Sequence, residues 1–449
     1  MGDCARPGPI FDSSMLRSSL IVALLSALAN IVSFANQLVL AHYFGARLEM
    51  DGYLLAASLP LTFSGLITGV LAYQLVPSLA RAEETPGAEP AFSGSLLVGL
   101  TLGGSVVAIA GFFVGPPLIR ICNPELPPAA FESARRVAQL AWLSLPCAIL
   151  STYFTAKLNI RHSFITAALA APVPMVGAMI ACILWHDSLG VVSISAGLAG
   201  GYAIQTLGLM MHTVGTLLSR RDGWRAQRQA RSLARNYPLS AAALLMFVIY
   251  PFSDAFWGSR LGPSATSYLG YAQRLMVGIG GITVAGATTV LFPRLARLSA
   301  QGDSDIFHAN FTVGLRAILV CLAPLAAILS VLGLPVLQLL FQRGAFGLED
   351  AKGIAQLMPG MLFGLLAMSC AGLMFKALFA QGAVRVAAGV STGGAVLYFS
   401  LSGAFSRLTG LSGISAAYAL TWWLVLLAGL YFLANRTTAK SSRPDNFRF

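Results

Sequence analysis

The 449-residue sequence is 56% hydrophobic, and only 10% of its residues are charged. Soluble globular proteins carry about 25% charged residues, so this composition excludes a soluble protein and indicates one that crosses a membrane many times. The net charge of +12 would suggest nucleic-acid binding in a soluble protein. In a membrane protein the same charge is first a signal of topology.

Apolar runs, each long enough for a helix to cross the bilayer, follow one another along the whole chain. They are continuous and do not alternate with polar residues, which excludes a membrane β-barrel. The first run is too long for the core of a signal peptide. We predict an all-α protein with about twelve transmembrane helices, at about 18–44, 52–78, 93–120, 135–157, 163–185, 190–218, 238–259, 265–292, 311–341, 353–380, 386–406 and 411–435.

Lysines and arginines are distributed unevenly over the predicted loops: about 20 lie on the side of the two termini and about 8 on the other side. The positive-inside rule therefore predicts that both termini are cytoplasmic and explains the net charge without nucleic acid as a partner. The predicted parts are an N-terminal segment (1–17), a first six-helix lobe (18–218), a basic linker (219–237), a second six-helix lobe (238–435) and a tail (436–449).

The linker is rich in arginine between Arg220 and Arg235. It is either a simple cytoplasmic connection or an amphipathic helix on the anionic surface of the inner leaflet.

Two short matches indicate an internal repeat. Residues 77–81 (PSLAR) close the predicted second helix as residues 293–297 (PRLAR) close the eighth, and residues 98–100 (VGL) open the third as residues 313–315 open the ninth. Six helices separate the members of each pair, so we predict parallel repeats related by an axis along the membrane normal.

Charged residues inside the predicted helices are candidates for function. An arginine in hydrocarbon costs roughly 2.5–3.5 kcal/mol on insertion scales, so Arg274, in the eighth helix, should face a cavity, a counter-charge or a substrate. It either contacts an anion or forms a structural pair with a neighbour such as Asp254 or Asp51. Asp254, late in the seventh helix, is either a proton or cation ligand or a solvated or paired carboxylate near the outer interface.

Amide side chains form the rest of the intramembrane polar set. Asn30 and Gln37 are seven residues apart in the first helix and share one of its faces, with Asn36 beside Gln37. Such a face either lines a wet cavity or holds neighbouring helices together by hydrogen bonds. Gln273 directly precedes Arg274.

Motifs for catalysis and metal binding do not occur in the sequence. It contains no GxxxxGK[ST] loop for ATP and no HExxH or GxSxG motif, and its six cysteines form no CxxC pair. We therefore expect no cofactor or metal site, and any transport would be driven by a gradient or by the membrane potential.

Several blocks of the sequence are similar to a known family. They are residues 44–46 (FGA), 50–52 (MDG), 59–60 (LP), 76–77 (VP), 271–276 (YAQRLM), 291–295 (LFPRL), 340–346 (LFQRGAF) and 350–351 (DA). In order and spacing they resemble the MviN/MurJ flippases of lipid-linked precursors, in the multidrug/oligosaccharidyl-lipid/polysaccharide exporter superfamily. The resemblance covers nearly the whole chain.

The resemblance implies two six-helix lobes that form a V around a central cationic cavity. It also implies alternating access that moves a polyprenyl-pyrophosphate-linked sugar from the cytoplasmic to the outer leaflet. Arg274 falls on the family's cavity arginine in the eighth helix, and Asp51 on the acidic residue that opens the second. From the polar residues within the membrane we expect the substrate to contact Arg274, Gln273, Asn30, Asn36, Gln37 and Ser64, with Asp51 and Asp254 as an ion site or a structural pair.

The sequence also departs from the family pattern. Asn30, Asn36 and Gln37 stand where the family's first helix usually carries two arginines and an aspartate, and Ser64 and Gly65 stand in place of paired arginines in the second. Gln273 replaces an aspartate, and two C-terminal helices of the peptidoglycan flippases have no counterpart.

We therefore expect a monomeric flippase of the bacterial cytoplasmic membrane. Its expected substrate is a lipid-linked glycan precursor for a surface polysaccharide, with peptidoglycan lipid II as the second choice. A cation-coupled drug exporter of the same fold and a membrane-embedded glycosyltransferase or ligase are the alternatives. The exporter would be expected to use a carboxylate in the first helix, and none is present there.

Overall fold

The computed structural model describes residues 13–83, 88–124, 126–161, 163–213, 223–301 and 304–441. These ranges contain helices and no strand, which confirms the all-α prediction. The helices are α1 (Ser13–Phe44), α2 (Leu48–Glu83), α3 (Ala88–Cys122), α4 (Pro128–Ile160), α5 (Phe164–Ala170), α6 (Val173–Leu189), α7 (Val192–Thr213), α8 (Gly223–Gly258), α9 (Ala265–Gln301), α10 (Ser304–Phe341), α11 (Leu348–Ala355), α12 (Met358–Ala380), α13 (Val384–Thr409) and α14 (Leu411–Ser441).

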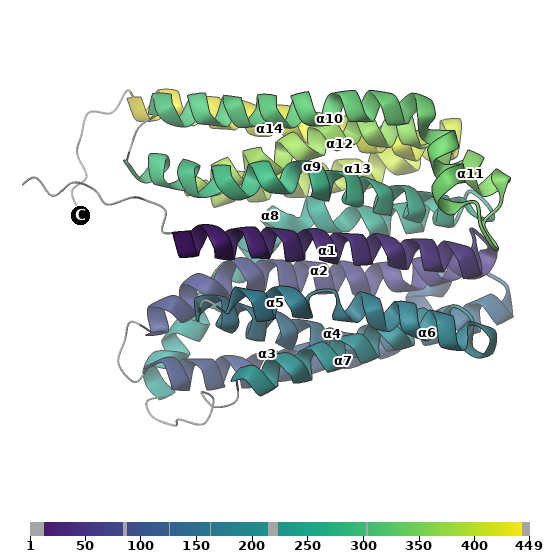
Figure 1. Ribbon diagram of the computed structural model, residues 1–449, viewed down its shortest axis with the longest axis horizontal. Helices are drawn as coiled ribbons and strands as arrows, with labels where there is room; N and C mark the ends of the chain where they lie inside the picture. The colour runs from purple at the N-terminus through teal and green to yellow at the C-terminus, as the bar shows by residue number, and fades with distance from the viewer. Residues whose placement is uncertain are drawn as a thin grey trace, which may run out of the picture.

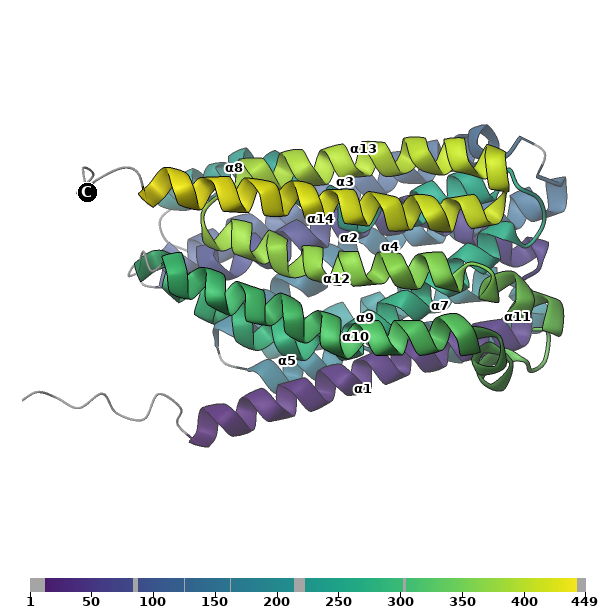
Figure 2. The same cartoon turned by 90° about the horizontal axis from the view of Figure 1, so that it is seen from above.

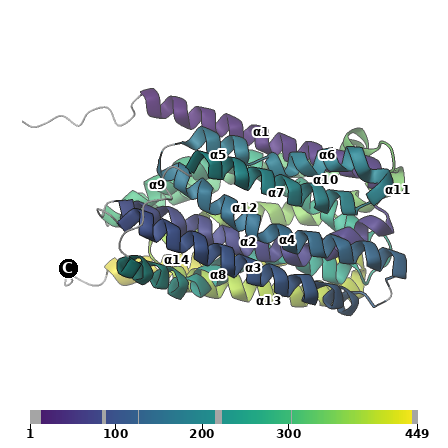
Figure 3. The ribbon, with the colours of Figure 1, turned by 90° about the horizontal axis from the view of Figure 1, so that it is seen from below.

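The long helices run side by side along one axis in two lobes, α1–α7 and α8–α14 (Figure 1). Figure 3 shows α3, α4 and α7 on the outside of the first lobe, with α5 and α6 beside them. The first residue of α1 and the last residue of α14 lie at the same end of the bundle, which we call the terminal end. The opposite end, with the turns after α1, α8 and α10, is called the far end.

Ten helical segments in the described ranges are long and apolar enough to cross a membrane. One of them joins α5 and α6 into a single span, Phe164–Leu189. The helices α1 and α9 are not among the ten, but both run along the bundle beside the others (Figures 1 and 2). With these two, the architecture agrees with the predicted number of crossings and with the two six-helix lobes.

Two of the predicted helices are broken. The predicted helix at 163–185 is divided into α5 and α6 because Pro172 and Pro174 lack the backbone N–H that would continue the hydrogen-bond ladder. The predicted helix at 353–380 is divided in the same way into α11 and α12, and Pro359 stands in the first turn of α12.

The helix ends also differ from the prediction. Helix α8 begins at Gly223, so residues 223–237 of the predicted linker form its first turns, while residues 219–222 lie outside the described ranges. Helix α14 continues through residue 441 into the predicted tail, and α1 begins at Ser13 inside the predicted N-terminal segment. Both PSLAR and PRLAR lie within α2 and α9 and do not end them.

Close backbone packing holds α6 against α7. A Cβ atom added to Gly197 would lie 2.3 Å from the carbonyl oxygen of Gly177, and one added to Gly201 would lie 2.6 Å from the Cα of Pro174. Membrane helices lack a hydrophobic driving force between them and depend on such close van der Waals contact. The glycines therefore allow α6 and α7 to pack closely against each other in the first lobe.

Candidate functional site between the lobes

Arg274 lies on α9 at the boundary between the lobes. Its Nη1 donates a hydrogen bond to Oε1 of Gln37 on α1, and the phenol of Tyr53 on α2 lies close enough to interact with its charge. Arg274 is half-buried, and no carboxylate in the described ranges forms an ion pair with it. The structural pairing of Arg274 with Asp51 or Asp254, left open by the sequence, is therefore not present. A cation bound only by neutral groups remains able to attract an anion.

A cavity of about 280 Å³ adjoins Arg274. It lies between α2 of the first lobe and α8 and α9 of the second, and its lining includes Ser58, Thr62, Tyr250, Asp254, Gln273 and Arg274. Most of its remaining lining residues are apolar. An apolar cavity with a few convergent polar groups is the usual form of a ligand site.

Asp254 lies in the interior of the second lobe, next to this cavity, with 2% of its surface exposed. Its Oδ2 accepts a hydrogen bond from Nε2 of Gln273, and its Oδ1 accepts one from the hydroxyl of Tyr398 on α13. The carboxyl group is thus bound on both oxygens and is not solvated at an interface. It links three helices of the second lobe, α8, α9 and α13.

Gln273 and Arg274 are adjacent on α9 but bind in different directions. Gln273 binds Asp254 within the second lobe, whereas Arg274 reaches α1 and α2 of the first lobe. This part of α9 therefore couples the interior of one lobe to the surface of the other.

Asp51 binds the start of α9 at the far end. Its Oδ2 accepts a hydrogen bond of 2.6 Å from the N–H of Ser264, and its Oδ1 accepts bonds of 2.7 and 2.6 Å from the N–H and the hydroxyl of Ser267. The first N–H groups of a helix have no partner within the helix, and a carboxylate there also interacts favourably with the helix dipole. Ser264 adopts a positive φ of 68°, uncommon for a residue with a side chain, beside this cap.

Two further contacts join the lobes at the far end. The hydroxyl of Tyr271 donates a 3.0 Å hydrogen bond to the carbonyl of Gly45, and the N–H of Ala345 donates a 2.8 Å bond to the carbonyl of His42. Gly45 has a positive φ of 57°, and a Cβ atom there would lie 2.4 Å from the carbonyl oxygen of Ala345. Together with Asp51, these contacts hold the lobes together at the far end.

The three amides of α1 do not behave alike. Gln37 binds Arg274 on α9. Asn30, two turns earlier on α1, also faces α9: a Cβ atom added to Gly281 would lie 3.6 Å from the Nδ2 of Asn30. Asn36 points into the first lobe, and its Nδ2 donates a 3.8 Å hydrogen bond to the sulfur of Met175. The shared face of Asn30 and Gln37 is thus directed at α9, as their spacing indicates.

One predicted site residue, Ser64, lies outside the cavity, and three residues that were not predicted contact the site. Ser64 does not line the cavity; its carbonyl accepts a 2.7 Å hydrogen bond from Thr68. The sequence analysis missed Tyr53, Ser267 and Tyr398, which provide the partners of Arg274, Asp51 and Asp254. Their only signal was a polar atom within an apolar run, and many other residues of this chain share it.

A sequence model of the family described as lipid II flippase MurJ matches residues 40–444. The chain belongs to this family. The lipid II flippase MurJ of Burkholderia cenocepacia is 23% identical over 90% of this chain and 80% of its own length. The probable lipid II flippase MurJ of Rhizobium meliloti is 25% identical over 88% of this chain and 76% of its own length. The MurJ family consists of transporters, so the chain is a flippase-family membrane protein and not an enzyme.

Solved structures show the same fold. A lipid II flippase MurJ in an inward closed conformation matches with a TM-score of 0.79 at 16% identity, covering 95% of this chain and 94% of that one. A multidrug resistance MATE family transporter in an inward-facing conformation matches with a TM-score of 0.73 at 13% identity, covering 91% of this chain and 100% of that one. The two-lobed fold that MurJ shares with MATE transporters is thereby confirmed for this chain.

Proposed function

We propose that the protein moves a polyprenyl-pyrophosphate-linked glycan precursor from the inner to the outer leaflet of the bacterial cytoplasmic membrane. The observation that carries this proposal is Arg274, a cation in an inter-lobe cavity whose hydrogen-bond partners are neutral. A pyrophosphate presents the oxygens that a guanidinium binds best. Family membership supports a lipid-linked substrate.

The geometry fits the physical task of a flippase. The polar head group needs a wet path through the bilayer, and the cavity with Arg274, Gln273 and Ser58 offers polar groups for it. The lipid tail must stay in hydrocarbon, and the first turns of α1 diverge from the bundle in Figure 2. The exposed apolar side chains Leu24, Leu28 and Ile31 of α1 suit contact with acyl chains.

Alternating access requires the far-end contacts to break during each cycle. Asp51, Tyr271 and Ala345 join the lobes by hydrogen bonds that water can replace when the far end opens. In the proposed orientation the termini are cytoplasmic, so these contacts close the outer side until the substrate is bound. Export of a pyrophosphate then runs with an inside-negative potential, worth about 2.3 kcal/mol per charge per 100 mV.

Peptidoglycan lipid II is the substrate that family membership favours. A precursor of a surface polysaccharide is the second candidate, because Gln37 provides an amide where the family pattern expects charge. Both candidates share the pyrophosphate that Arg274 would bind, and they differ in the sugar. We propose that the protein acts as a monomer.

The test is complementation of a strain that lacks its lipid II flippase, followed by reconstitution. We expect the wild-type chain to complement and Arg274→Ala to fail while it still inserts at normal levels. In proteoliposomes, labelled lipid II and an undecaprenyl-pyrophosphate sugar of another pathway would be compared for leaflet accessibility. Transport by Arg274→Ala equal to that of the wild type would contradict the proposed role of this residue.

A cation-coupled drug exporter is the remaining alternative. It is supported by Asp254, a buried carboxyl group of the kind that could bind a coupling cation. Export of a cationic dye that survives Arg274→Ala and stops in Asp254→Asn would favour it over the flippase.

A further inference from the structure

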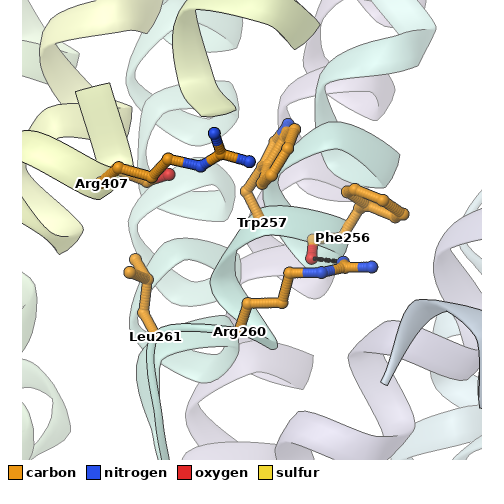
Figure 4. Close-up of a pocket in the computed structure, with 6 residues that line it drawn as sticks. Phe256, Trp257, Arg260, Leu261 and Arg407 are labelled. Carbon is orange, nitrogen blue, oxygen red and sulfur yellow. Dashed lines mark hydrogen bonds between the residues drawn. The ribbon is translucent and has the colours of Figure 1, made fainter. Parts of the chain in front are cut away.

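A second cavity lies at the far end, away from the site between the lobes. It has a volume of about 360 Å³ and is lined by Phe256, Trp257, Arg260, Leu261, Ser406 and Arg407. Residues 256–261 come from the end of α8 and the turn that follows, and residues 406–407 come from the last turn of α13. Figure 4 shows the guanidinium of Arg407 extending toward Trp257 and the guanidinium of Arg260 beside Phe256.

The two arginines are bound in different ways. Nη1 of Arg260 donates a 2.7 Å hydrogen bond to the carbonyl of Phe256, one turn earlier, and Nη2 donates one of 3.5 Å to the carbonyl of Ile121 on α3. The guanidinium lies 3.8 Å from the centre of the Phe256 ring. It thus partly serves as a cap for the last carbonyls of α8. Arg407 makes no such bond to the carbonyl of Gly403, the equivalent position on α13; that carbonyl accepts from the hydroxyl of Ser406.

Among the described residues, neither guanidinium has an acidic partner. The carboxylates that form ion pairs in the described ranges are Glu132, Asp187 and Glu349, and their partners are other residues. Arg407 is exposed and keeps its five N–H donors for a ligand. Two cations beside one cavity without counter-charges repel each other, and an anion between them removes this repulsion.

The surroundings determine which kind of anion fits. Trp257, Phe256 and Leu261 are the apolar residues that line the cavity, and Leu408, the residue after Arg407, is 78% exposed. Tryptophan and arginine at the ends of transmembrane helices mark the level of the lipid head groups. A phosphate at this level that is attached to acyl chains satisfies both the arginines and the apolar rim, whereas free phosphate satisfies only the arginines.

We propose that this cavity binds the phosphate head group of an anionic phospholipid in the leaflet at the far end. The ligand phosphate accepts hydrogen bonds from Arg407 and from the free N–H groups of Arg260, and its acyl chains lie along Phe256 and Leu408. The lipid spans the ends of α8 and α13 and joins two helices of the second lobe. The proposal does not depend on what the protein transports.

The test is native mass spectrometry of the full-length protein released from nanodiscs of phosphatidylglycerol and phosphatidylcholine. We expect retained phosphatidylglycerol on the wild type and roughly tenfold weaker retention in Arg407→Gln, because a charge-assisted hydrogen bond is lost. Arg260→Gln/Arg407→Gln should lose it entirely. Arg343→Gln is the matched control, since Arg343 is an exposed arginine at the same end and outside the cavity.

Two results would overturn the proposal. One is equal retention of the two lipids, or equal loss in Arg343→Gln and Arg407→Gln, which would indicate a general effect of surface charge. The other is calorimetric binding of inorganic phosphate that Arg407→Gln abolishes while lipid retention stays unchanged, which would assign the cavity to a soluble anion. The melting temperatures of all variants establish that the chains compared are folded.

Discussion

Asp254 and Arg274 line the same cavity between the lobes, yet each binds to neutral side chains and not to the other. An ion pair between them would have to be broken before a substrate anion could reach Arg274. The observed arrangement avoids that cost, which for a buried pair is several kcal/mol. The cation is thus held ready for an anion, while the carboxyl group is enclosed by Gln273 and Tyr398.

The first prediction concerns the hydroxyl of Tyr398. Tyr398→Phe removes one of the two donors of Asp254 and leaves a buried oxygen of the carboxyl group without a partner. We expect a loss of about 1–3 kcal/mol in the free energy of unfolding, measured as a lower melting temperature in detergent. Tyr250→Phe is the control, because the Tyr250 hydroxyl lines the same cavity and binds no carboxylate. An equal effect of both substitutions would contradict the role of the Tyr398 hydrogen bond.

The second prediction concerns the cap of α9. Asp51→Ala leaves the N–H groups of Ser264 and Ser267 without their acceptor and removes a contact between the lobes. A lost cap costs about 1 kcal/mol, so the far end should open more often.

Accessibility measures this opening. In a background without the native cysteines, Ser58→Cys, in the cavity, should react with a membrane-impermeant thiol reagent several times faster when Asp51→Ala is present. Glu49→Ala is the control, because Glu49 is an exposed carboxylate in the same first turn. Unchanged labelling in Asp51→Ala would show that Asp51 does not hold the far end closed.

Most of the fold could be predicted from hydropathy, because the bilayer leaves helices as the available structure for continuous apolar runs. The break before Pro359 was missed, since a proline in a membrane helix can also leave it intact. A helix was one of the two alternatives for the basic linker, and residues 223–237 are helical; their continuation into α8 was not predicted.

The site was predicted less completely. Arg274, Gln273 and Gln37 were singled out because a polar side chain within the membrane is energetically costly, and this cost indicates a specific contact or a function. Their partners could not be identified, because Tyr53 and Tyr398 look like other aromatic residues until the helices are placed in space. The sequence also placed Asp254 near a solvated interface, whereas its depth in the second lobe depends on the packing of α8 against α13.

The third prediction concerns the packing of α6 against α7. A Cβ atom in Gly197→Ala would lie 2.3 Å from the carbonyl oxygen of Gly177, closer than any real contact, so the helices must separate. We expect a destabilisation of about 1–3 kcal/mol or a failure to accumulate, measured by melting temperature and yield. Gly200→Ala, on the same helix, is the control because nothing lies within 4 Å of its added Cβ. Similar losses in both variants would point to helix flexibility as the cause.

The fourth prediction concerns the neutral partner of Arg274. Gln37→Glu places a carboxylate where Oε1 of Gln37 now accepts the hydrogen bond from Arg274. The new ion pair would compete with the substrate, because a charge-assisted hydrogen bond is roughly twice as strong as a neutral one. We expect transport of a pyrophosphate-linked lipid in proteoliposomes to fall by roughly tenfold or more, while the melting temperature stays the same or rises.

Gln356→Glu is the control for the added charge, because Gln356 is exposed between α11 and α12 and does not line the cavity. It should transport as the wild type does. A Gln37→Glu variant that is folded and transports normally would show that Arg274 does not bind the pyrophosphate. Loss of transport together with a lower melting temperature would instead show that α1 requires the amide to pack. Only a stable and inactive variant agrees with a cation held ready for a substrate anion.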